Sequence, residues 1–137
     1  RIYDYLGYIY MKCEMGNSRT GQFFTPFNLS ELTAKLSIDN IEKIKQTNDI
    51  ITLNEPACGG GGLILAYLKI LKDNNINYQK RVKIIAQDLD FRSVYMTYIQ
   101  LSLVGARAKV VQGDTLTEPD TKDKNCIFYT PMWKGLL

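Results

Sequence analysis

The sequence predicts an α/β domain built on a parallel sheet with helices on both faces. Three observations support this prediction. Short β-rich runs alternate with segments whose apolar residues recur at helical spacing, and the connections between the runs are long enough for crossover helices. The third observation is NEPACGGGG at residues 54–62, which places four glycines directly after the first β-rich run and before a helical segment.

Length and composition indicate one domain, because 137 residues with 45% hydrophobic and 23% charged residues can bury a core. A net charge of +3 permits a polyanionic partner without requiring one. The start at Arg1 leads us to expect a piece of a longer protein. No apolar run approaches the length of a membrane span, so we expect no membrane partner.

Cysteine and histidine usage bears on compartment and metal binding. The three cysteines, Cys13, Cys58 and Cys126, lie far apart, form no CxxC pair, and occur in a chain without histidine. We therefore expect a reducing, cytoplasmic compartment and no metal. Cys58 beside the glycines is expected to be a small packed residue, because no histidine is available to activate it as a nucleophile.

Residues 1–48 are expected to form a helical lead-in that carries a rigid loop, GQFFTP at residues 21–26. In this loop Thr25 can cap the following helix, and Asp39 with Glu42 looks like a capping pair for a shorter one. The expected helices lie near residues 2–11, 27–36 and 40–46.

Residues 49–137 are expected to form the parallel sheet core, so that residues 1–137 make a single domain. The β-rich runs predict strands near residues 50–53, 82–86, 109–112 and 126–129. Apolar residues at helical spacing predict helices over residues 63–71 and 91–103.

An acidic residue follows each of the first three predicted strands: Glu55, Asp88 and Asp114. The carboxyl ends of parallel strands share one edge of a sheet, where open α/β sheets bind ligands. Glycines after the first strand allow backbone amides and a helix N-terminus to approach a ligand closely. A carboxylate ending the second strand can accept hydrogen bonds from a ribose. These positions together predict a nucleoside-containing cofactor, whereas the glycine run alone could be a structural turn.

Two common phosphate-binding patterns fail at the glycines. The third glycine of G-x-G-x-x-G falls on Ile64, which weakens the case for a dinucleotide. The phosphate loop needs Gly-Lys-Ser/Thr, where this chain has Gly62-Leu63-Ile64. Glu55 beside the turn would repel a pyrophosphate but would suit the cationic sulfonium and ammonium groups of S-adenosylmethionine.

Four motifs in order resemble those of N6-adenine DNA methyltransferases, and above all the modification subunits of type I restriction systems. The motifs are GQFFTP at 21–26, EPACGGGG at 55–62, QDLD at 87–90 and QGDTL at 112–116. The resemblance covers Tyr5 to Trp133 and corresponds to the N-terminal part of such a catalytic domain. It implies a Rossmann-like, S-adenosylmethionine-dependent methyltransferase fold, of which this chain is the N-terminal portion with a short helical lead-in.

The resemblance also implies which residues bind S-adenosylmethionine. Residues of the first motif would contact its methionine and purine parts, Glu55 and the glycines its amino acid end, Asp88 its ribose and Asp114 the amine of its adenine. The full set of cofactor-binding residues that the resemblance implies is Phe23, Phe24, Thr25, Glu55, Pro56, Ala57, Gly59, Gly61, Asp88, Leu89, Asp114 and Thr115.

The family holds an adenine extruded from duplex DNA with an Asn/Asp-Pro-Pro-Tyr/Phe motif after the fourth strand. This chain departs from that pattern, because the corresponding residues read Thr130-Pro131-Met132-Trp133. The resemblance implies catalytic roles for Thr130, Pro131 and Trp133, with the ring of Trp133 available to stack on a base. A threonine in place of the amide or carboxylate leaves a single hydroxyl acceptor at this position.

The leading functional prediction is methyl transfer from S-adenosylmethionine to adenine N6 in DNA. Two alternatives stay open: a relative that binds the cofactor without chemistry, as a regulatory or structural module, and a methyltransferase with another acceptor. The strands predicted here would leave one sheet edge open, so a homodimer, a specificity subunit or a continuation of the chain could cover it.

Overall fold

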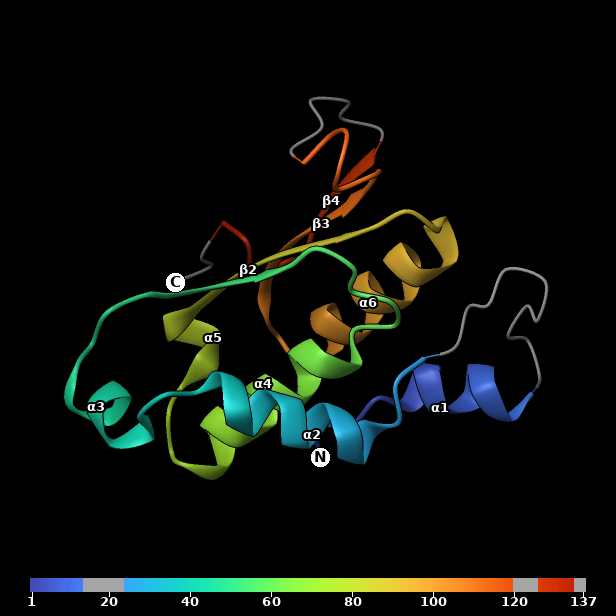
Figure 1. Ribbon diagram of the computed structural model, residues 1–137. Coiled ribbons are helices and arrows are strands. Elements are labelled where there is room, and N and C mark those ends of the chain that lie inside the picture. Colours follow the sequence, from blue (N-terminus) through green and yellow to red (C-terminus); the bar gives the residue numbers. More distant parts are fainter. Residues whose placement is uncertain (14–23, 120–125, 135–137) are drawn as a thin grey trace.

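A four-stranded sheet forms the centre of the protein in a computed structural model that describes residues 1–13, 24–119 and 126–134 (Figure 1). The strands are β1 (Ile51–Glu55), β2 (Val82–Asp88), β3 (Arg107–Gln112) and β4 (Ile127–Tyr129), and they lie side by side in that order. The helices are α1 (Tyr5–Lys12), α2 (Phe27–Ser37), α3 (Ile41–Gln46), α4 (Gly62–Asp73), α5 (Tyr78–Arg81) and α6 (Phe91–Leu103).

The first three strands are parallel, as the sequence predicted. Glu55 lies beside Ala86, and Asp88 lies beside Gln112, so β1, β2 and β3 all end at one edge of the sheet. This edge is hereafter the carboxyl edge. The register brings the segments that follow the three strands together, which is the condition that a shared binding site requires.

The fourth strand differs from the prediction. β4 runs antiparallel to β3, with Ile127 beside Val111 and Tyr129 beside Lys109. It therefore starts at the carboxyl edge and ends at the opposite, amino edge. A parallel fourth strand needs a crossover that returns the chain to the amino edge, whereas an antiparallel strand can begin at the edge where β3 ends.

The helices lie on one side of the sheet, not on both as predicted. Figure 1 shows α2, α4 and α6 on the same side of the sheet. In β2, Val82 and Ile84 are buried, whereas Lys83 between them faces the opposite side and is exposed. The strand order explains this arrangement. The steps from β1 to β2 and from β2 to β3 go in the same direction, so two right-handed crossovers place α4 and α6 on one face.

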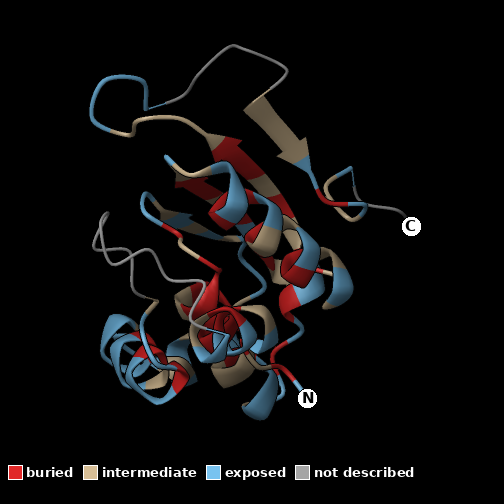
Figure 2. Cartoon of the chain, turned by 90° about the vertical axis from the view of Figure 1, so that its right-hand side faces the viewer, coloured by how far each residue is buried: buried red, intermediate tan, exposed pale blue. Residues whose placement is uncertain are grey.

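Buried residues gather where the helices meet the sheet (Figure 2). Leu65, Leu68 and Leu71 of α4 are fully buried, and so are Ile84 of β2 and Leu101 of α6. The 3.6-residue period of the helices explains why apolar side chains three apart share this inner face. The core therefore fixes α4 and α6 against the strands whose ends carry the acidic residues.

The ends of two helices correct the predicted caps. Pro26, not Thr25, is the N-cap residue of α2, and its side chain makes no capping hydrogen bond. Asn40, not Asp39, caps α3, because its side-chain oxygen accepts a hydrogen bond from the Lys43 amide at 3.0 Å. Both predicted helices nevertheless begin within a residue or two of the expected position, where helix boundaries are least certain from sequence.

Thr130 directly follows β4 and is 2% exposed. Its hydroxyl donates to the Ala106 carbonyl at 2.7 Å and accepts from the Ala108 amide at 2.9 Å. These hydrogen bonds connect the end of β4 to the start of β3 at the amino edge of the sheet. The Thr130 hydroxyl is thus a partner of the sheet backbone in this structure.

We expect Thr130→Ala to lower the free energy of unfolding by about 1–3 kcal/mol, because it leaves buried backbone groups of β3 without their hydrogen-bond partner. Thr130→Ser keeps the hydroxyl and is expected to cost less. Urea unfolding followed by circular dichroism measures both changes. A Thr130→Ala variant as stable as the unmodified chain would show that the hydroxyl has no structural role.

Candidate functional site

The glycine turn, residues 58–62, connects β1 to α4 at the carboxyl edge. Gly59 and Gly61 have φ angles of 52° and 90°, in the left-handed region that favours glycine. A Cβ on Gly61 would lie 3.0 Å from the Thr97 hydroxyl, and one on Gly62 would lie 2.8 Å from a carboxylate oxygen of Asp4. Neighbouring side chains of the protein itself therefore require several of these glycines.

Two polar side chains of α6 hold the glycine turn. The Thr97 hydroxyl donates to the Gly59 carbonyl at 2.8 Å, and the Gln100 side-chain amide donates to the Gly60 carbonyl at 2.7 Å. The two residues are three positions apart and so share one face of α6. These contacts turn the carbonyls of Gly59 and Gly60 toward α6. Neither residue was predicted from the sequence, where their only signal was a polar side chain on the apolar face of a predicted helix.

Asp4 joins the start of α1 to the same network. Its Oδ1 atom accepts hydrogen bonds from the Gly7 amide at 2.8 Å and from Gln100 Nε2 at 2.7 Å. The Gln100 side-chain oxygen accepts in turn from the Leu6 amide at 3.1 Å. Asp4 is 4% exposed, and burial raises the pKa of its carboxyl, although the hydrogen bonds from Gln100 and Gly7 act in the opposite direction.

Asp88, at the end of β2, binds the glycine turn from the other side. Its Oδ2 atom accepts from the Gly59 amide at 2.8 Å, and Oδ1 accepts from the Asp90 amide at 2.9 Å. The Asp88 backbone carbonyl accepts from the Gly113 amide at 3.0 Å. Asp88 therefore links the ends of all three parallel strands and remains half-buried.

The segment after β3 closes on the segment after β1. The Thr115 hydroxyl donates to the Pro56 carbonyl at 2.6 Å, and Asp114 Oδ1 accepts from the Leu116 amide at 2.9 Å. The second bond is a local turn of the kind that aspartate side chains favour. Asp114 and Thr115 are thus brought next to the turn, as the strand-end reasoning predicted.

Two pockets flank the glycine turn. The Glu55 pocket has a volume of about 310 Å³, and the Asp114 pocket has a volume of about 420 Å³. The predicted cofactor-binding residues that line the Glu55 pocket are Phe24, Thr25, Glu55, Ala57 and Gly59. Those that line the Asp114 pocket are Pro56, Ala57, Asp88, Leu89, Asp114 and Thr115. Gly61 lines neither pocket, and Phe23 lies outside the described residues.

The two pockets differ in chemistry. The Glu55 pocket combines the carboxylates of Asp4 and Glu55 with the ring of Phe24, a set that suits a cationic group. In the Asp114 pocket the side chains of Leu89 and Leu116 are 67% and 93% exposed beside two carboxylates. Apolar walls with carboxylate acceptors suit a flat group that carries hydrogen-bond donors.

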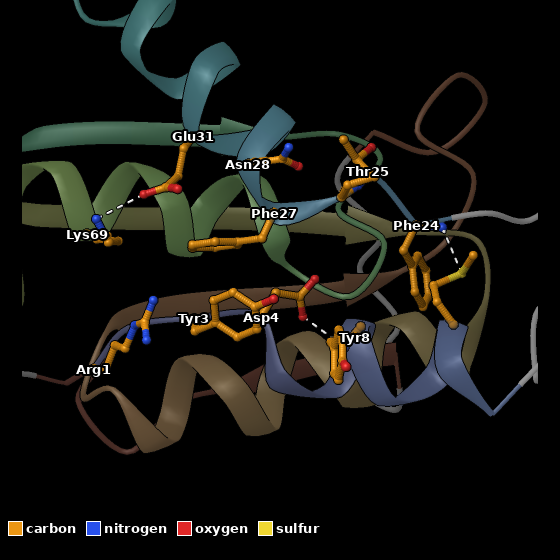
Figure 3. Close-up of a pocket in the computed structure, with 13 residues that line it drawn as sticks. Arg1, Tyr3, Asp4, Tyr8, Phe24, Thr25, Phe27, Asn28, Glu31 and Lys69 are labelled. Atoms are coloured by element: carbon orange, nitrogen blue, oxygen red, sulfur yellow. Dashed lines mark hydrogen bonds and ion pairs between the residues drawn. The ribbon is translucent and has the colours of Figure 1, made fainter.

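A third pocket, the Tyr8 pocket, adjoins the Glu55 pocket and shares Asp4, Phe24 and Thr25 with it (Figure 3). Its volume is about 490 Å³. At one end Lys69 pairs with Glu31 at 2.9 Å, and at the other the Phe24 amide contacts Met11 Sδ at 3.5 Å. This pocket is lined by residues of α1 and α2 and by Phe24 and Thr25, two of the predicted cofactor-binding residues.

Cys58, the first residue of the glycine turn, is buried, and its environment disfavours the thiolate. Burial, with smaller contributions from the charges of Asp88 and Glu55, raises the pKa of the thiol to about 12. A thiol with that pKa stays protonated at neutral pH and is a poor nucleophile.

The structure does not bring the predicted catalytic residues to this site. Thr130 lies at the level of Ala108, near the amino edge, and the ring of Trp133 lies 4.8 Å from the Lys83 ammonium at the start of β2. The four residue-to-residue steps along β3 from Ala108 to Gln112 alone span about 13 Å. Catalytic roles for Thr130, Pro131 and Trp133 stay a prediction.

Among residues 1–13, 24–119 and 126–134, no group of three or more His, Cys, Asp or Glu side chains could hold a metal ion. In the same described part of the chain, no helix has both the length and the apolar content of a membrane span.

Comparison with known proteins gives a consistent set of matches. A family model described as N-6 DNA Methylase matches residues 1–132. The type II methyltransferase M.BanIII of Aneurinibacillus aneurinilyticus is 31% identical over 112 residues, which is 80% of this chain and 19% of that protein. The type I restriction enzyme MpnII methylase subunit of Mycoplasma pneumoniae is 27% identical over 118 residues, 84% of this chain and 20% of that protein. This chain thus spans about a fifth of the length of these relatives.

A crystal structure from Listeria monocytogenes, assigned as a class I S-adenosylmethionine-dependent methyltransferase, shares the fold. It superposes with a TM-score of 0.61 at 18% identity and covers 82% of this chain and 32% of its own. At that identity the likeness shows the fold.

We expect iodoacetamide at pH 8 to alkylate exposed Cys13 rapidly in the folded chain and to leave Cys58 unmodified, because the buried Cys58 thiol stays protonated. Mass spectrometry of tryptic peptides measures each site. The same reaction in urea is the control and should modify both cysteines. Equal labelling of Cys58 and Cys13 in the folded chain would contradict the buried, high-pKa thiol.

Proposed function

The chain belongs to the N-6 DNA methylase family, and from this membership we propose that it holds the S-adenosylmethionine of an enzyme that methylates adenine N6 in DNA. The methyltransferase fold predicted from the sequence is confirmed, and S-adenosylmethionine is the cofactor of the family. The observation that carries the proposal is the pair of pockets next to the glycine turn, which all of the predicted cofactor-binding residues except Phe23 and Gly61 line.

The chemistry of the two pockets supports an orientation for the cofactor. The carboxylates of Asp4 and Glu55 suit the ammonium group of the amino acid end, and the N-terminus of α4 at Gly62 and Leu63 suits its carboxylate. Asp88 would accept hydrogen bonds from the ribose. Asp114 would accept from the exocyclic amine of the adenine, with exposed Leu89 and Leu116 beside the ring.

The bound cofactor would supply a methyl group activated by a sulfonium. What this chain contributes is position and electrostatics, since its carboxylates favour the cation and its glycine turn is held rigidly by α6. Cys58, the thiol nearest the site, is buried with a pKa of about 12. This favours direct transfer of the methyl group to the acceptor amine over transfer through a covalent enzyme intermediate.

The same proposal includes the substrate that accepts the methyl group and the partner chains. A relative of this chain is a type I restriction enzyme methylase subunit. By analogy we propose duplex DNA with an extruded adenine as the substrate, and a specificity subunit or a second copy of the chain as a partner.

A second candidate function is a cofactor-binding module without methyl transfer of its own. It is favoured by the position of Thr130, whose hydroxyl binds the backbone of β3 at the amino edge. Incubation of the chain with methyl-labelled cofactor and adenine-containing duplex DNA separates the two. Labelled N6-methyladenine supports the enzyme, and saturable cofactor binding without label in the DNA supports the module.

We expect S-adenosylmethionine to bind saturably in calorimetric titration and Asp88→Ala to weaken this binding at least 10-fold. Asp88 both holds the Gly59 amide at 2.8 Å and faces the Asp114 pocket, and hydrogen bonds to a charged group are worth about 1.5–3 kcal/mol. NAD is the control ligand, because its pyrophosphate would meet the carboxylate of Glu55.

Thr130→Ala is the matched protein control, since it removes polar atoms at the amino edge and leaves both pockets intact. It should change the affinity less than about threefold at a temperature where circular dichroism shows it folded. An equal loss of affinity in both variants would contradict the assignment of Asp88 to the cofactor.

A further inference from the structure

Ser30 of α2 has a buried hydroxyl that makes no hydrogen bond with any described residue. The residue is 1% exposed, so bulk water does not compensate for the missing partner. A buried hydroxyl without a partner costs roughly 1–3 kcal/mol, and such groups are uncommon in native structures. Its position beside the Glu55 pocket, which it lines, points to a partner that occupies the pocket.

Asp4 presents a second acceptor at the same place. Its Oδ1 atom is engaged by Gly7 and Gln100, whereas Oδ2 meets no hydrogen-bond donor within the part of the chain that the structure describes. In Figure 3 the two carboxylate oxygens of Asp4 point in different directions, and only one carries a dashed hydrogen bond to the α1 backbone. Asp4 also lines the Glu55 pocket.

The Oδ2 atom of Asp4 and the hydroxyl of Ser30 converge beside Gly62. A Cβ placed on Gly62 would lie 2.8 Å from Asp4 Oδ2 and 3.5 Å from Ser30 Oγ. Since glycine has no Cβ, both oxygens can face this part of the pocket. The two atoms come from α2 and from the residue that caps α1, elements far apart in the sequence, yet they border one space next to the first turn of α4.

A carboxylate oxygen beside a hydroxyl that can also accept a hydrogen bond favours a ligand group that donates hydrogen bonds and carries positive charge. No Lys or Arg is among the described residues that line the Glu55 pocket, so none of these lining residues supplies such a cation. In S-adenosylmethionine the sulfonium has no N–H or O–H group, and the exocyclic amine of the adenine is uncharged. The α-ammonium of the methionine end has three donors and a positive charge.

We propose that Asp4 Oδ2 and Ser30 Oγ form the subsite for the α-ammonium group of the cofactor, an inference that rests on the proposed function. Asp4 then acts with both oxygens: Oδ1 fixes Gln100 and with it the glycine turn, and Oδ2 binds the ligand. Ser30 accepts a hydrogen bond from the same ammonium group, which gives its hydroxyl the partner that the described residues do not provide.

The experiment is a calorimetric cycle that changes the protein and the ligand in turn. The ligands are S-adenosylmethionine and its deaminated analogue, in which hydrogen replaces the α-amino group. The variants are Asp4→Asn, whose amide oxygen can still accept from Gly7 and Gln100, and Ser30→Ala, which removes a hydroxyl without protein partners. Asp39→Asn is the matched control, because this exposed carboxyl lines neither the Glu55 pocket nor the Asp114 pocket.

We expect Asp4→Asn to weaken S-adenosylmethionine binding by roughly 10- to 100-fold and Ser30→Ala by roughly 3- to 10-fold. Neither change should alter the affinity for the deaminated analogue by more than about threefold, because the analogue lacks the group that the two oxygens bind. Asp39→Asn should change neither affinity.

Three results would overturn the subsite. Equal weakening of both ligands by Asp4→Asn would mean that Asp4 only supports the turn. Equal affinity of the unmodified chain for both ligands would mean that the ammonium is not bound, although the proposed function would stand. A folded chain that binds no S-adenosylmethionine would remove the proposed function and the subsite together.

Discussion

The hydrogen bonds of the Gln100 side chain are the constraint on which the candidate site depends. One amide group contacts the Gly60 carbonyl, the Asp4 carboxylate and the Leu6 amide, all within 3.1 Å. It thereby joins α6, the glycine turn and the start of α1. Because all of these groups are buried or partly buried, loss of the Gln100 side chain would leave the Gly60 carbonyl and the Leu6 amide without this partner, and satisfied networks of this kind favour a single geometry.

This network explains how one turn can serve two pockets of different chemistry. Hydrogen bonds from α6 point the carbonyls of Gly59 and Gly60 toward that helix, and the Asp88 carboxylate accepts a hydrogen bond from the Gly59 amide. The turn is thus fixed before any ligand arrives, so that little conformational entropy remains to be lost on binding. The Glu55 pocket and the Asp114 pocket therefore keep their positions next to the turn.

The sequence predicted the parts of the site that follow from local pattern and parallel pairing. The helix at Phe91–Leu103 has its expected bounds, and Asp88 and Asp114 meet at the carboxyl edge because parallel strands end together. Hydrogen bonds between residues far apart in the sequence could not be predicted in this way, since nothing near Asp4 in the sequence indicates that Gln100 is its partner. The direction of β4 could not be predicted either, because three residues of a strand read alike in both directions. Helices on both faces would have required a reversal of strand order that the described strands do not contain.

The bond between Asp4 and Gln100 has a consequence for how the protein folds. It joins residues that are 96 positions apart, so the chain between them must be closed into a loop before the bond can form. Closing such a loop costs entropy that only later contacts repay, and long-range contacts of this kind slow folding. We therefore expect the glycine turn to acquire its final shape only after α4, β2 and α6 have come together. A ligand that needs this turn would then select chains in which the segment from Asp4 to Gln100 has already folded.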